Sequence, residues 1–397
     1  MAKKNPPVRY EYVSPDCGSV RFLSEIEDPR RDHGKRHKLE DILTIALCTI
    51  LTGHSEFTEM EFFGELREDW LSGFLELPNG IPSHDTFRNV FCAIDPEAFL
   101  EVFARWTCCV REKSSGEIIA FDGKALRGTK GGQDNIRTVV GAWAVGAGIS
   151  LGQVDVEGKS NEWERSGHRL PSRIIHSSQI TALPKLLEFL DLKGCIVTAD
   201  AMGCQKEVAR RAVAARADYV LAVKGNQPSL LEQVSGYLDG LITDGLEVHV
   251  SENQADGRKE VRRCWVADQL GWMGGREEWS GLKSVAAVEL ECTRDGKTSL
   301  ERRYFITSLA PDPTKIAHAV RAHWGIENSL HWVLDVVFGE DSSRARTRNA
   351  ASNLSSLRRL CHNLIKREEQ YAKWSVKKRK FAASQNPDYL ERLLGLK

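Results

Sequence analysis

Three acidic residues stand where the surrounding sequence could give a carboxylate a chemical role. Asp122 follows the apolar segment 117–121, and Asp200 ends the apolar segment 194–200; both segments are typical of β-strands. In open α/β sheets, ligands bind beyond the carboxyl ends of the strands. Glu327 lies in a predicted helix among large apolar side chains, so we expect it to be partly buried. The three acids are therefore candidates for one site.

Each of these acids also has a purely structural interpretation. The DG step at Asp122 is typical of a turn, and Asp200 could cap the start of a helix. Glu327 could be the partner of an ion pair on its own helix. Taken singly, these interpretations are favoured, and only the combination of the three acids favours a site.

Two aspartates and a glutamate suit the cleavage of a phosphodiester. Two Mg²⁺ ions about 3.5–4 Å apart can activate a nucleophile and stabilise the leaving oxygen. Mg²⁺ is a hard cation that carboxylate oxygens, water and substrate phosphate hold. We expect Asp122 to bridge the two ions, with Asp200 and Glu327 each completing one side. Mn²⁺ could replace Mg²⁺, and no organic cofactor is needed.

The predicted helix around Glu327 offers a different metal site. His323, Glu327 and His331 are spaced four residues apart, so they share one face of an α-helix. Two histidines and a carboxylate could hold a transition metal, although neither H-E-x-x-H nor a cysteine partner is present. In the alternative interpretation, these histidines, with Arg321 and Asn328, contact DNA phosphates or orient the glutamate.

The first 112 residues are predicted to be helical. Helical spacing of apolar residues predicts helices over 38–51, 58–75 and 96–112, and a short helix that begins after Ser83. The short helix carries His84, Arg88 and Asn89. It could be a recognition helix that reads DNA, or a helix that only packs in the core.

Strands and helices alternate after residue 112. The segments 138–145 and 149–156 predict a hairpin, and further strands and helices alternate as far as residue 240. Residues 241–312 predict a β-rich insertion with DG turns. Residues 315–338 predict a helix, and a last helix has an apolar stripe. Its members are Leu354, Leu357, Leu360, Cys361 and Leu364.

Composition limits the class of protein without naming it. The chain of 397 residues is 41% hydrophobic and 28% charged, which is typical of a folded globular protein. The apolar run 42–51 is too short to cross a bilayer, so we expect no membrane contact and a cytoplasmic location. The net charge is zero, but basic residues cluster at 29–38, 343–348 and 366–381. Charge therefore neither supports nor excludes DNA as a partner.

Six segments resemble the H-repeat-associated insertion-sequence transposases, a DDE-type family, and they occur in the family's order over nearly the whole chain. The segments are GIPSHDTF (80–87), IIAFDGKALRG (118–128), VTADAMGCQKE (197–207), DYVLAVKGNQ (218–227), RYFITSL (303–309) and VRAHWGIENSLHWVLDVVFGED (320–341).

The resemblance implies an α/β fold with a ribonuclease-H-like core, an inserted β-rich subdomain and a helical N-terminal domain. We place the N-terminal transposase-associated domain at 1–112 and the catalytic core at 113–240 and 313–370. The β-rich insertion would then be 241–312, and a basic C-terminal tail would be 371–397.

Motif position in the family also assigns residues to roles. Asp122, Asp200 and Glu327 match the catalytic triad. Other residues of the matched loops are expected to contact the DNA backbone, because phosphates are met chiefly by Lys, Arg and amide side chains. These predicted DNA-binding residues are Lys124, Arg127, Lys224, Asn226, Gln227, Arg321, His323, Asn328 and His331.

The chain departs from the family's pattern in two places. Related transposases often carry a Tyr-Arg-Glu-Lys signature around the last acid, whereas Val320, His323 and Leu334 stand at the flanking positions here. Arg321 could substitute for the missing arginine. The segment 163–179 is interposed where the family usually continues directly, and it could be a surface loop or could alter activity.

The leading hypothesis is therefore a Mg²⁺-dependent DNA transposase. It would bind double-stranded DNA at the inverted-repeat ends of its own element, cut a strand, and join the freed 3′-hydroxyl to target DNA. A homo-oligomer on DNA, associated with the nucleoid, would bring two ends together. Two alternatives stay open: a metal-dependent nuclease without strand transfer, and an inactive DNA-binding remnant.

Overall fold

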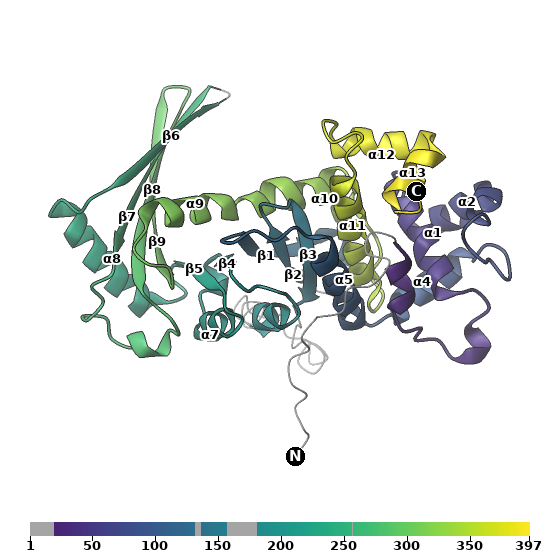
Figure 1. The fold of residues 1–397 in the computed structure, drawn as a ribbon, viewed down its shortest axis with the longest axis horizontal. Helices are drawn as coiled ribbons and strands as arrows, with labels where there is room; N and C mark the ends of the chain where they lie inside the picture. The colour runs from purple at the N-terminus through teal and green to yellow at the C-terminus, as the bar shows by residue number, and fades with distance from the viewer. Residues whose placement is uncertain (1–19, 132–135, 157–180, 256) are drawn as a thin grey trace, which may run out of the picture. The chain divides into compact units, whose positions relative to one another are not determined.

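The protein is described by a computed structural model that covers residues 20–131, 136–156, 181–255 and 257–397 (Figure 1). Contacts divide the chain into two compact units. The first unit contains Met1–Glu112, Gly123–Val156 and Glu327–Lys397, and the second contains Lys113–Asp122 and Glu157–Ile326. These boundaries differ from the predicted domains, because residues 1–112 belong to one unit with two later segments. The predicted loop 163–179 lies outside the described residues.

The N-terminal helices of the first unit follow the predicted segments closely. They are α1 (Leu39–Leu51), α2 (Phe57–Leu66), α3 (Glu68–Leu71), α4 (His84–Ala93) and α5 (Pro96–Val110). The segment expected as one helix over 58–75 is interrupted at Arg67. Ser83 caps α4 as expected, because its hydroxyl accepts a hydrogen bond from the Thr86 amide. Phe87, Val90 and Phe91 bury one side of α4.

Helix α11 (Ala350–Arg367) forms the centre of the first unit. It contacts α1, α4, α5 and strand β3, and its predicted apolar stripe is buried. More of α11 is buried than the predicted stripe alone, because Arg358 and Arg359 are buried as well. The C-terminal segment is not an extended basic tail: it forms α12 (Val376–Gln385) and α13 (Pro387–Leu393), with Arg379 and Lys380 buried.

The predicted hairpin is also part of the first unit. Strands β2 (Arg137–Ala144) and β3 (Ile149–Asp155) pair antiparallel, with a shift of register between Ala142 and Trp143. Gly152 lets β3 lie against α5, because a Cβ there would come within 2.4 Å of the Leu100 side chain. The hairpin is confirmed.

Parallel strands form the part of the second unit that carries the two aspartates. Strand β4 (Ile196–Ala199) lies between β1 (Ile118–Leu126) and β5 (Asp218–Val223), and both pairings are parallel. A helix over 181–188, α7 (Lys206–Ala214) and α8 (Pro228–Thr243) separate the later strands along the chain. The chain is therefore a mixed α/β protein, as the alternating pattern predicts.

Four further strands follow α8, in the region predicted to be a β-rich insertion. They are β6 (His249–Ala255), β7 (Arg258–Ala267), β8 (Ser284–Arg294) and β9 (Lys297–Thr307). They pair antiparallel in sequence order, and β9 also pairs with β5. Both Asp295 and Gly296 have positive φ, which joins β8 to β9 by the tight turn expected of a DG pair. The strands are as predicted, but they extend the sheet of the second unit.

Among the described residues, the hydrogen-bonded strand order is β3-β2-β1-β4-β5-β9-β8-β7-β6. Strand β1 has residues in both units. Within the described ranges, no helix is both long and apolar enough to span a membrane.

The predicted helix 315–338 is interrupted. It consists of α9 (Pro313–His323), a π-helical turn (Ile326–His331) and α10 (Trp332–Val336). A π-turn closes i→i+5 hydrogen bonds and so interrupts the α-helical hydrogen-bond pattern. His323 ends α9, whereas Glu327 and His331 lie in the π-turn, so the three residues do not belong to one continuous α-helix as expected. Such turns are frequent at functional sites.

Candidate active site

Asp122 lies at the point where the parallel pairing of β1 ends. The last paired residues are Phe121 of β1 and Ala199 of β4, so Asp122 and Asp200 are the next residues on two neighbouring strands. Adjacent strands lie about 4.7–4.9 Å apart, which brings the two aspartates together at one edge of the sheet in the second unit. Strand β1 itself continues to Leu126, which corrects the expectation that it ends before Asp122. Both aspartates are half-buried.

Asp200 caps the start of a helical turn, as its structural interpretation predicts, and it also remains a candidate metal ligand. Its Oδ1 accepts hydrogen bonds from the amides of Met202 (3.0 Å) and Gly203 (3.4 Å), and it thereby caps the 3-10 turn Ala201–Gly203. Both bonds use the same oxygen, so Oδ2 lies outside the cap. A Cβ on Gly203 would come 2.4 Å from the Ala199 Cβ, so only glycine lets the turn pack this tightly on β4.

Two of the predicted DNA-binding amides support the Asp200 turn. The Asn226 side-chain amide donates to the carbonyl oxygen of Ala201 at 2.6 Å, and that of Gln227 donates to the carbonyl oxygen of Cys204 at 3.0 Å. These bonds tie the loop after β5 to the loop after β4. In this structure the amides of Asn226 and Gln227 position the turn that carries Asp200.

His323 anchors the end of α9 on the same strand. Its Nδ1 lies 3.0 Å from the Thr198 hydroxyl, and Thr198 is two residues before Asp200. Burial lowers the pKa of His323 to about 4; the charge of Asp200 acts to raise it and that of Arg303 to lower it further. His323 is therefore neutral at pH 7. A half-buried neutral ring is suited to orienting the chain and poorly suited to holding a phosphate.

Glu327 begins the last of the three segments of the first unit and lies in the π-helical turn. Its side chain is exposed, which corrects the expectation of partial burial. Arg321 and Asn328, two of the predicted DNA-binding residues near it, are exposed as well, and His331 is half-buried. Lys224 is exposed directly after β5.

Lys124 has a role inside the protein. Only 6% of its side chain is exposed, and its ammonium lies 2.5 Å from Asp335, 3.5 Å from Glu340 and 3.8 Å from Asp341. A buried cation paired with carboxylates inside the protein is not available to DNA, so we do not carry forward the predicted backbone contact of Lys124. Arg127 differs, because 76% of its side chain is exposed.

The donor chemistry of the second unit fits a hard divalent cation. Mg²⁺ is commonly bound by one or two carboxylates, with water and substrate phosphate as the other ligands. Asp122 and Asp200 supply two such carboxylates at one sheet edge. In the ranges that the structure describes, no three His, Cys, Asp or Glu side chains are grouped to hold a metal. Such a group is found neither for His323, Glu327 and His331 nor for Asp122, Asp200 and Glu327.

Some of these features were not predicted from the sequence. The contact between His323 and Thr198 joins residues 125 positions apart, and no local pattern reports it. The carboxylates around Lys124 lie more than two hundred positions further along the chain. The sequence does contain one signal near these residues, the basic run 343–348.

Two sequence families match the chain. Residues 176–364 match the family described as "Transposase DDE domain", and residues 20–107 match the family described as "DDE_Tnp_1-associated". Asp200 and Glu327 fall within the range 176–364, whereas Asp122 falls in neither range. The chain belongs to the H-repeat-associated family of DDE-type transposases.

Individual relatives cover almost all of the chain. "Putative transposase YncI" of Escherichia coli O157:H7 is 38% identical over 94% of this chain and 93% of its own length. "H repeat-associated putative transposase YhhI" of Escherichia coli K12 is 32% identical over 94% of this chain and 97% of its own. A solved piggyBac transposase synaptic complex with hairpin DNA aligns with a TM-score of 0.42 and 12% identity, over 96% of this chain and 78% of that chain.

Proposed function

We propose that this protein is a DNA transposase that cuts DNA at the ends of its element and transfers the freed strand into target DNA. The observation that carries the proposal is the pair Asp122 and Asp200, set at equivalent positions on adjoining parallel strands. Membership of the transposase family supplies the reaction class. The parallel strands β1, β4 and β5, with the hairpin β2–β3, support a ribonuclease-H-like core.

Each acid has a distinct part in the proposal. Asp122 and Asp200 would hold divalent metal, Mg²⁺ or Mn²⁺, at the sheet edge, and Glu327 would be the third carboxylate ligand. Metal bound there would activate the attacking oxygen and offset charge on the leaving oxygen. His323 would act as a positioning residue: its contact with Thr198 fixes the end of α9, four residues before Glu327.

The proposed partner is double-stranded DNA, first the inverted-repeat ends of the element and then the target. Joining two ends requires two active sites, so we propose a homo-oligomer assembled on DNA. Because DNA is the substrate, the protein would act in the cytoplasm at the nucleoid.

The test is metal-dependent cutting of DNA that carries the element's ends. Asp122→Asn, Asp200→Asn and Glu327→Gln should each reduce cutting by roughly a hundredfold or more, because each removes a charged metal ligand. Asp244→Asn and Glu247→Gln are matched controls, since both residues are exposed acids of the second unit. Thermal unfolding of every variant checks that it is folded.

Three outcomes separate the candidate functions. Joined strand-transfer products that depend on the triad support transposition, and triad-dependent cutting without joined products identifies a nuclease. End binding without cutting at any Mg²⁺ or Mn²⁺ concentration identifies an inactive remnant. The last candidate is worth testing because one relative, 41% identical over 18% of this chain, is named "Inactive transposase YbfQ". Wild-type cutting by all three triad variants would overturn the assigned site.

A further inference from the structure

Two loops of the first unit lie in direct backbone contact. One is the 3-10 turn Arg127–Thr129, which follows β1, and the other is the segment 342–347, which leads to α11. A Cβ on Gly128 would come 2.1 Å from the carbonyl oxygen of Ser343, so a side chain at Gly128 would push the loops apart. The Arg346 Nε also donates to the Gly128 carbonyl oxygen at 3.3 Å. Glycine at this position therefore holds the two loops together.

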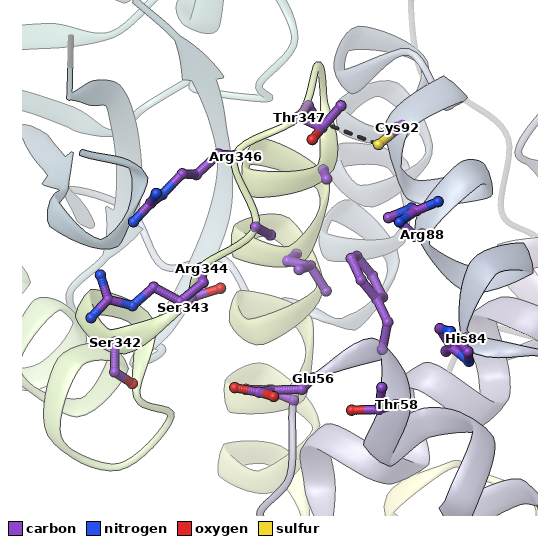
Figure 2. A pocket seen from close by; sticks show the side chains of 15 residues that line it. Glu56, Thr58, His84, Arg88, Cys92, Ser342, Ser343, Arg344, Arg346 and Thr347 are labelled. Atoms are coloured by element: carbon purple, nitrogen blue, oxygen red, sulfur yellow. Dashed lines mark hydrogen bonds between the residues drawn. The ribbon is translucent and has the colours of Figure 1, made fainter. Parts of the chain in front are cut away.

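The paired loops carry four exposed cations, which we call the loop-pair strip. Its members are Arg127, Lys130, Arg344 and Arg346. Figure 2 shows Arg344 and Arg346 directed to the same side of their segment, away from Arg88 and Cys92. The segment also borders a pocket of about 430 Å³, which Arg344 and Arg346 line together with Phe57 and Leu354.

Among the residues that the structure describes, one carboxylate is paired with a cation of the strip. Asp341 lies 3.7 Å from Arg127, but its carboxylate also lies 3.8 Å from the buried Lys124. The chain as a whole has a net charge of zero, so attraction to a polyanion must come from local concentrations of positive charge. The strip is such a concentration on adjoining loops.

We infer that the loop-pair strip binds the phosphate backbone of duplex DNA without reading its sequence. The inference rests on the proposed function only in that DNA is the partner. Guanidinium groups match phosphate oxygens in a bidentate fork, and three of the four cations are arginines. Contacts of this kind position a protein on DNA and carry no base specificity. Of the DNA-backbone contacts predicted from the sequence in this region, the inference keeps Arg127 and drops the buried Lys124. It adds Lys130, Arg344 and Arg346.

The experiment measures how the affinity for DNA depends on salt. Full-length protein binds a fluorescent duplex of arbitrary sequence in EDTA, with NaCl varied between about 50 and 200 mM, the range in which phosphate contacts strongly affect affinity. The logarithm of affinity falls with the logarithm of salt by about 0.9 for each phosphate contacted. Arg127→Gln/Arg344→Gln should therefore make the slope shallower by about 2. Among the described residues, neither the Arg127 side chain nor the Arg344 side chain donates a hydrogen bond to the opposite loop, so the double variant should leave the loop pair intact.

The matched control removes the same charge elsewhere in the first unit. Lys377→Gln/Lys378→Gln changes two exposed lysines of α12, and it should leave the slope nearly unchanged. Arg127→Lys/Arg344→Lys keeps the charge and should retain most of the slope. Arg346→Gln gives a second reading, with thermal unfolding to check that the loss of its bond to Gly128 leaves the protein folded. A slope that changes equally in the strip and control variants would overturn the inference.

The assay separates this inference from the proposed function. No metal is present, so binding does not depend on the triad, and Asp122→Asn should bind with the wild-type slope. If the triad variants cut DNA normally while the strip variants lose the slope, the active-site assignment fails and the strip stands. If the triad variants lose cutting but the strip variants keep the wild-type salt dependence of DNA affinity, the inferred role of the strip is wrong.

Discussion

At the scale of single residues, several side chains near the candidate site have a structural role as well as a proposed role in catalysis or DNA binding. Asp200 caps a 3-10 turn through Oδ1, and Asn226 holds the same turn in place. A carboxylate fixed in this way loses little freedom when a ligand arrives, which is how a site is preorganised. His323 contributes to the same region by fixing the end of α9 against Thr198.

The burial of His323 predicts a pH dependence of stability. The pKa of His323 is about 4 in the folded protein, against 6.5 for an ordinary histidine. Between those two pH values the unfolded chain therefore binds more protons than the folded protein. The contribution of His323 to the free energy of unfolding is complete above pH 6.5 and is lost as the pH falls toward 4. This one group should lower the free energy of unfolding by about 2 kcal/mol between pH 7 and pH 5.

Urea unfolding at pH 7 and pH 5 measures this effect. His323→Gln should lose that part of the pH dependence, whereas His318→Gln should keep it, because His318 is exposed on the same helix. His362 is also buried, with its pKa lowered to about 3 by burial, so some dependence should remain in His323→Gln. The same dependence in both variants would contradict a buried neutral His323.

At the scale of elements, the first unit is organised around buried charge on α11. Arg359 lies 3.3 Å from Glu340, and both are buried. The Ser355 hydroxyl donates to the same Glu340 oxygen at 2.7 Å. Burial by itself would raise the pKa of Glu340, but the charges of Arg359, Arg358 and Lys124 together lower it. One carboxylate therefore compensates several buried cations.

Loss of the Glu340 charge should destabilise the first unit strongly. Glu340→Gln leaves Arg359 and Lys124 short of a buried partner, so we expect the free energy of unfolding to fall by about 3–5 kcal/mol. Urea denaturation measures it, with the exposed Glu369→Gln as the matched control. The pKa of Glu340 is lower in the folded protein than in the unfolded chain. The difference in the free energy of unfolding between wild type and variant should therefore reach its full size above pH 4.5 and shrink below it. A loss as small as that of the control would refute this role.

At the scale of the whole molecule, neither unit is a continuous stretch of chain. The helices before residue 112 pack on α11, which lies more than two hundred residues later. The Asn353 side-chain amide of α11 donates to the carbonyl oxygens of Phe91 and Ile94 at 2.9 and 3.0 Å. The Cys361 thiol of α11 contacts the Leu47 carbonyl oxygen. The N-terminal helices therefore depend on the C-terminal part of the chain.

A fragment of residues 1–112 should not fold cooperatively by itself. Without α11 it would expose the apolar faces of α1, α4 and α5, and its buried area would be too small to offset the loss of chain entropy. Circular dichroism during thermal unfolding should show a broad, non-cooperative change for the fragment and a sharp one for the full chain. A sharp transition in the fragment would instead support the independent domain predicted from the sequence.

The local parts of the fold were predictable because local patterns encode them. Helical spacing located α1, α4, α5 and α11, the alternating strands and helices predicted a mixed α/β protein, and the DG pair located the turn between β8 and β9. Recurrent motifs also identified the family, since they hold a fixed order along the chain. The triad itself remains a prediction from those motifs.

Tertiary structure alone decided which distant residues meet and which side chains are buried. Lys124 looked like a DNA contact until three carboxylates from further along the chain enclosed it. The helix around Glu327 was predicted to be continuous, and a π-turn interrupts it. The region 241–312 was predicted to be β-rich, and only the structure shows that its last strand, β9, pairs with β5. The physical reason is the same in each case: burial and pairing depend on the position of the whole chain in space, and periodicity within a short window cannot report it.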